Sequence, residues 1–117
     1  MLPYLHLMPR VERDIDECLD FIARQPRGKP SDRESDICLG IGKALLRPES
    51  NRVESWRPET GIELRRCKAA QFVIVYAYLR PTVTSTRGVV SIRAVRHSRV
   101  EDVFSGVKEP AATYTQP

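Results

Sequence analysis

The sequence shows no pattern that predicts a membrane span, a disulfide framework or a secretion signal. Its most apolar run, Phe72 to Leu79, has eight residues, far fewer than the roughly 20 that cross a bilayer. Its three cysteines are too few and too widely spaced for a disulfide framework. The N-terminus lacks the charged and apolar regions of a signal peptide. We therefore expect a cytoplasmic protein with reduced thiols and no membrane contact.

Metal-binding patterns are missing as well. The histidines, His6 and His97, and the cysteines form neither a CxxC nor an HxxxH pair, so we expect no metal, and we expect no cofactor. With 41% hydrophobic and 29% charged residues, the chain is neither disordered nor fibrous in composition. Its 117 residues suit one domain, which we place at residues 1–109, followed by a flexible tail at 110–117.

Positive charge is concentrated in one part of the chain. The formal net charge is +4, but residues 57–99 hold 9 Lys and Arg against 2 Asp and Glu, a net of +7. Residues 1–56 carry a net of −1, and residues 100–117 a net of −2. Such asymmetry indicates an anionic partner for the basic part of the chain, the alternative being a solvated basic face with no specific partner.

Hydrophobic spacing predicts a short strand at residues 4–7 and then two helices. Apolar residues from Val11 to Ile22 recur at helical intervals, and a capping box at Ser31 begins the second helix, which ends before Pro48. Gly40 and Gly42 either weaken that helix or let it pack closely on the first one. The short connection between the helices predicts an antiparallel helical hairpin.

Three further strands are expected, at residues 61–67, 72–79 and 89–95. The middle one is apolar on both faces, as in a central strand that is covered on both sides. The order β-α-α-β-β-β predicts a two-layer α+β fold. In this fold the N-terminal strand and a three-stranded antiparallel meander form one sheet, and the helical hairpin buries its apolar stripe on that sheet.

Four stretches of the sequence follow a known pattern. They are Leu7-Met8-Pro9 followed by Arg13-Asp14-Ile15, Leu45 to Pro48, Arg65 to Tyr76, and Val90 to Arg99, a last strand that ends in His and Arg. In these stretches and in its order of elements, the chain resembles the RelE/ParE superfamily of toxins from bacterial type II toxin–antitoxin (plasmid stabilisation) systems. The resemblance covers about residues 4–106. The sequence departs from the family pattern at Ala70, where a glycine is usual, and at Val100, which precedes the expected acidic residue.

The resemblance implies one of two activities. RelE-like members cleave mRNA in the ribosomal A site, whereas ParE-like members poison DNA gyrase and arrest growth without catalysing a reaction. Metal-free RNA cleavage needs an acid or base and a clamp for the phosphate. The candidate residues are His97 as acid or base, with Arg65, Arg66, Arg96 and Arg99 as the clamp.

Each candidate residue also has a purely structural interpretation. A single histidine at a strand end is more often structural than catalytic, and Tyr76 fits the core. Arg65 and Arg66 alternate in direction, so at most one of them faces a given site. Residues 31–47 have no net charge, which disfavours extensive docking on ribosomal RNA. These points favour the ParE-like alternative, in which the chain itself is not an enzyme.

The implied protein partner is a cognate antitoxin whose acidic, disordered C-terminal segment folds onto the toxin. We expect Arg65, Arg66, Arg93, Arg96, Arg99 and Trp56 to bind partners. DNA gyrase is the expected target, with the ribosome and its mRNA as the alternative. A third possibility is a family member that has lost toxicity and only binds its antitoxin.

Overall fold

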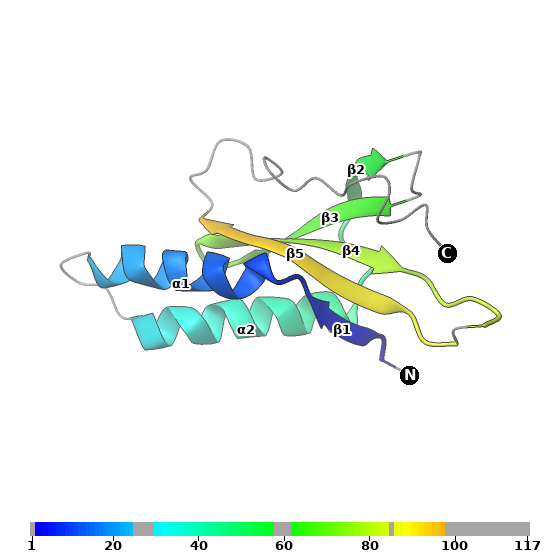
Figure 1. Cartoon of the computed structure of the whole chain (residues 1–117), viewed down its shortest axis with the longest axis horizontal. Coiled ribbons are helices and arrows are strands. Elements are labelled where there is room, and N and C mark those ends of the chain that lie inside the picture. The colour runs from blue at the N-terminus through cyan, green and yellow to red at the C-terminus, as the bar shows by residue number, and fades with distance from the viewer. Residues whose placement is uncertain (1, 25–29, 58–61, 85, 98–117) are drawn as a thin grey trace.

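A computed structural model describes residues 2–24, 30–57, 62–84 and 86–97 of the chain (Figure 1). The elements are β1 (Tyr4–Leu7), α1 (Arg10–Ala23), α2 (Pro30–Leu46), β2 (Val53–Arg57), β3 (Ile62–Ala69), β4 (Phe72–Leu79) and β5 (Val89–His97). The predicted tail at residues 110–117 lies outside the described residues.

The predicted α+β class with a helical hairpin is confirmed, but the predicted sheet is wrong in its number of strands. Five strands are arranged in the order β1-β5-β4-β3-β2, with β1 parallel to β5 and the other pairs antiparallel. The unpredicted strand is β2, so that the meander has four strands. Its Val-Glu-Ser-Trp-Arg sequence lacks the continuous apolar character of a central strand because it lies at the edge of the sheet.

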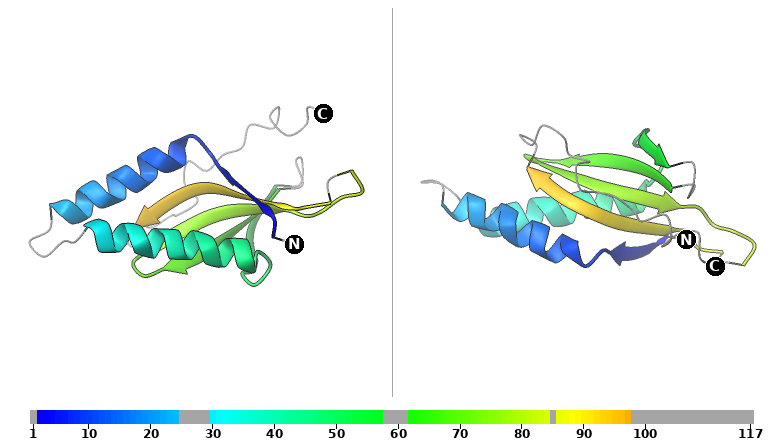
Figure 2. Two further views of the ribbon diagram at one scale, coloured as in Figure 1. Left: turned by 90° about the horizontal axis from the view of Figure 1, so that it is seen from below. Right: turned by 45° about the horizontal axis from the view of Figure 1, so that its top comes forward.

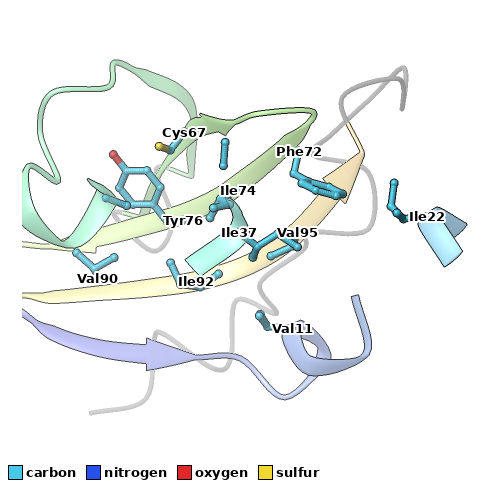
Figure 3. Close-up of a cluster of buried hydrophobic side chains, with 12 residues drawn as sticks. Val11, Ile22, Ile37, Cys67, Phe72, Ile74, Tyr76, Val90, Ile92 and Val95 are labelled. Atoms are coloured by element: carbon cyan, nitrogen blue, oxygen red, sulfur yellow. The ribbon is translucent and has the colours of Figure 1, made fainter. Parts of the chain in front are cut away.

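Both helices lie on the same side of the sheet (Figure 2). The main core fills the space between them and the sheet, and several of its side chains are shown in Figure 3. Its buried members are Val11, Ile22, Ile37, Ala44, Cys67, Ala69, Phe72, Ile74, Tyr76, Val90, Ile92 and Val95. A second buried cluster belongs to the strands alone and comprises Ile62, Leu64, Val73, Val75, Ala77 and Ala94. Strand alternation places these two clusters on opposite faces of β3 and β4, which we call the helix face and the distal face.

Two contacts determine how the helices sit on the sheet. In α1, the buried carboxylate of Asp14 accepts a hydrogen bond from the backbone N–H of Val95 at 3.1 Å. Because β1 ends opposite Ile92, Asp14 takes the place of a neighbouring strand at this edge of β5. In α2, Gly40 lies directly over Ala69 and Ile74. The close approach that Gly40 allows is therefore to the sheet and not to the first helix.

The turn between β3 and β4 has an unusual backbone conformation. Ala69 pairs with Phe72, so the loop has two residues, and its first residue, Ala70, has a φ of 54°. Two-residue hairpin loops require positive φ values that favour glycine. Ala70 therefore occupies a position where alanine in place of glycine carries a conformational cost.

Candidate functional site: a basic groove on the distal face

A groove of about 470 Å³ lies on the distal face, where β3 meets β2. Its lining residues, which we call the basic groove, are Asn51, Arg52, Glu54, Arg66, Lys68 and Val73. Arg66 and Lys68 are two residues apart on β3, so both side chains point to the same face. Val73 pairs with Lys68 across β3 and β4 and, although it is only 7% exposed, it adds an apolar side chain to the lining.

A carboxylate lies between two guanidinium groups in this groove. Glu54 contacts Arg66 at 2.6 Å, from Oε2 to Nε, and Arg52 at 3.6 Å, from Oε1 to Nε. The Glu54 side chain is 13% exposed, whereas those of Arg66 and Arg52 are 48% and 85% exposed. Among the described lining residues, three cations therefore outnumber one anion, and the cations reach further into solvent than the carboxylate does. Such an arrangement attracts anionic groups.

The segment from Pro48 to Arg52, which forms one wall of the groove, is hydrogen-bonded to the core. The buried phenol of Tyr76 donates a hydrogen bond to the carbonyl of Pro48 at 2.8 Å and lies 3.2 Å from the side-chain amide of Asn51, which donates to it. Burial raises the pKa of Tyr76, so it remains a neutral donor at physiological pH. Tyr76 thus belongs to the core, as the sequence suggested, and it also fixes the position of the groove wall.

The two neighbouring arginines of β3 have separate roles. Arg65 is 4% exposed on the helix face and donates to the carbonyls of Asn51 at 2.5 Å and Glu49 at 3.5 Å. It also forms an ion pair of 3.0 Å with Glu63. The two side chains point to opposite faces of the sheet, as expected for adjacent residues of a strand. Arg66 is the arginine of the groove, and Arg65 holds the chain between α2 and β2.

His97 lies on the other side of the sheet from the groove. It pairs with Phe72, a residue of the helix-face core, and its ring makes edge contacts with Phe21 and Phe72 at centroid distances of 5.6 and 6.0 Å. A second pocket of about 230 Å³ lies here, beside α1; it is lined by Arg10, Asp14, Glu17, Cys18, Phe21, Val95, Arg96 and His97. The proposed acid or base is therefore not next to the phosphate clamp that Arg66 could form.

The remaining predicted site residues lie in different environments. Arg96 pairs with Val73 and lines the second pocket at the edge of β5. Arg93 is 4% exposed, and burial lowers its pKa to about 10, which leaves it cationic at neutral pH. Arg99 and the side chain of Trp56 lie outside the described residues. Of the predicted residues, Arg66 is thus the only one that the described part of the chain places in the groove.

Sequence reasoning missed three charged residues of the groove, Arg52, Glu54 and Lys68. Lys68 has the same spacing signal as Arg66, because alternate residues of a strand share a face. Arg52 and Glu54 gave no such signal, since their position depends on β2, which the sequence did not predict. Glu54 is the most consequential of these, because it is the only acidic residue in the described lining.

Within the part of the chain that the structure describes, no three His, Cys, Asp or Glu residues are grouped so that they could hold a metal ion. No described helix is both long enough and apolar enough to cross a membrane. Comparison with known proteins adds no assignment: no family model matches the chain, and no curated protein is significantly similar to it.

Proposed function

We propose that this chain is the toxin of a type II toxin–antitoxin pair, similar to the RelE/ParE toxins, and that it acts as a ParE-like inhibitor of DNA gyrase. A helical hairpin on one face of the sheet and a cationic groove on the other support this proposal. The observation that carries it is the separation of His97 from Arg66 by the sheet. A surface that binds anionic groups on the face opposite His97 suits an inhibitor better than a nuclease that uses His97 as its acid or base.

The groove suits recognition of acidic side chains. Arginine binds carboxylates through a planar fork of donors, and lysine adds a mobile point charge. The side-chain ends of Arg52, Arg66 and Lys68 are at the surface, so a partner reaches them without rearrangement of the core. Both the target and the neutralising antitoxin are proposed partners, and they need not contact the same residues.

The proposal is tested by expressing the chain from a tightly repressed, inducible promoter and by assaying the purified protein with gyrase. We expect growth arrest and inhibition of DNA supercoiling. Arg66→Ala should weaken inhibition about tenfold or more, because a charge-assisted contact is lost. The matched control is Arg80→Ala, which removes an arginine of similar exposure whose 2.6 Å partner, Glu49, lies outside the groove. Normal supercoiling at excess toxin would refute the proposal.

One observation favours a second candidate, the ribosome-dependent mRNA endonuclease. Glu54 lies 2.6 Å from Arg66, and a carboxylate beside a guanidinium can act as a base next to a phosphate clamp. This candidate predicts cuts in translated mRNA, detected by primer extension, that Glu54→Gln abolishes. His97→Ala should leave the cuts in place, since His97 lies on the helix face. Intact mRNA during growth arrest would exclude this candidate.

A further inference from the structure

We propose that Glu54 is an internal competitor in the basic groove. Its carboxylate occupies the position that an acidic side chain of a partner peptide takes on binding, and the partner binds by displacing it from Arg66 and Arg52. This inference rests on the proposed function for the existence of an acidic protein partner. The acidic partner would bind in the basic groove, and Glu54 would lower the affinity of the chain for that partner.

The exposures of the three side chains support displacement. Glu54 is mostly buried, but Arg66 is half exposed and Arg52 is largely exposed. Both ion pairs with Glu54 are made by Nε atoms. An arginine has five N–H donors, and among the described residues the terminal nitrogens of Arg66 have no acidic partner. An incoming carboxylate can therefore engage Arg66 from the solvent side before Glu54 leaves it.

The dimensions of the groove match an extended peptide. Arg66 and Lys68 are alternate residues of one strand, which places their Cα atoms about 6.6 to 6.8 Å apart. Alternate side chains of an extended partner repeat at the same distance. Acidic side chains at positions i and i+2 of such a peptide would meet Arg66 and Lys68 together.

The lining favours carboxylates over nucleic acid. Single-stranded nucleic acids are usually bound by aromatic side chains that stack on the bases as well as by cations. The described lining of the groove contains no aromatic ring. It already holds a carboxylate, however, at 2.6 Å from Arg66. The structure thus contains an example of the contact that we propose for the partner.

The test compares two isosteric substitutions that change net charge equally. Glu54→Gln removes the competing carboxylate, whereas Glu49→Gln removes a carboxylate that pairs at 2.6 Å with Arg80 outside the groove. The probes are a fluorescein-labelled decapeptide of alternating Glu and Leu and an oligo-uridine decamer of RNA. Binding to the full chain is measured by fluorescence anisotropy at about 50 mM and 200 mM salt. The ionic part of the affinity is the part that falls at the higher salt concentration, because salt screens exposed charges.

We expect Glu54→Gln to bind the peptide about tenfold more tightly than the wild-type chain, and Glu49→Gln to stay within about twofold. Adding Arg66→Ala to Glu54→Gln should remove the gain. Equal gains in both Gln variants would show a general charge effect and overturn the proposal. A gain restricted to RNA, or no peptide binding by any variant, would overturn it as well.

A second substitution, Glu54→Ser, keeps the test decisive if Glu54→Gln fails to fold, and it should give a gain of the same sign. Growth arrest by the wild-type chain does not depend on any of these outcomes. Arrest together with an unchanged affinity of Glu54→Gln would therefore reject the competitor while leaving the proposed function in place. If the proposed function is wrong, the wild-type chain itself will fail to arrest growth.

Discussion

Two glycines of α2 should respond to the same substitution with opposite signs. A Cβ at Gly40 would overlap the Cβ of Ala69 and come within 2.6 Å of the Cδ1 atom of Ile74. A Cβ at Gly42 would meet nothing within 4 Å. Both positions lie inside the helix, so the intrinsic preference of a helix for alanine applies to both. Only the contact with the sheet differs.

The magnitudes follow from two opposing contributions. Replacing glycine by alanine inside a helix gains up to about 1 kcal/mol. At Gly40 this gain is opposed by overpacking, which typically costs about 1 to 3 kcal/mol. The upper part of that range applies, because the Cβ of Ala69 is fixed to the backbone and cannot rotate away, although the end of Ile74 can. We expect Gly40→Ala to destabilise the fold by about 1 to 2 kcal/mol and Gly42→Ala to stabilise it by about 0.5 to 1 kcal/mol.

Urea unfolding followed by far-ultraviolet circular dichroism measures both free energies. A difference of about 2 kcal/mol between the variants corresponds to roughly 8 °C or more in melting temperature for a domain of this size. The double variant Gly40→Ala with Ala69→Gly should recover part of the loss, since it removes the fixed atom. Equal stabilities of the two single variants would refute the packing of α2 on the sheet. A Gly40→Ala protein as stable as wild type would do the same.

Other contacts give predictions of similar kind. Asp14→Ala should destabilise by about 2 kcal/mol in urea unfolding, because a buried backbone N–H loses its acceptor, whereas the exposed Asp16→Ala should stay within about 0.5 kcal/mol. Ala70→Gly should stabilise by about 1 kcal/mol, since it relieves the positive φ. Burial raises the pKa of Tyr76, so its contribution is complete below the unfolded value of about 10 and is lost as the pH rises through the folded-state pKa. Tyr76→Phe should reduce this alkaline loss. Cys38, the exposed cysteine, should react first with a thiol reagent, and mass spectrometry of the partly labelled chain should locate the label there.

Most of the fold could be predicted because its core elements carry strong local signals. The apolar spacing from Val11 to Ile22 marks α1, and the run from Phe72 to Leu79 marks β4, which is the central strand. β2 gave no comparable signal. It lies at an edge and pairs with β3 through an irregular register between Val53 and Ser55, and three of its five residues are polar. The position of Ala70 was visible as a departure from an expected glycine, but its backbone conformation was not.

The candidate site was predictable only where one strand determines it. Alternation along β3 establishes that Arg65 and Arg66 point in opposite directions, but it does not say which of them faces solvent. That depends on the chain between α2 and β2, whose carbonyls at Glu49 and Asn51 accept hydrogen bonds from Arg65. The partnership of Arg66 with Glu54 likewise joins two strands, and sequence separation alone does not predict it.

The core and the groove are linked through the same short segment. Asn51 contributes a side chain to the groove lining, donates to Tyr76 and accepts from Arg65 through its carbonyl. The groove wall is thus held by two buried side chains that never reach the groove. Since a binding surface gains affinity when its geometry is fixed before the partner arrives, the buried arginine of β3 supports recognition indirectly. Under the proposed function, Arg66 acts by direct contact with the partner, whereas Arg65 acts through the segment that it holds.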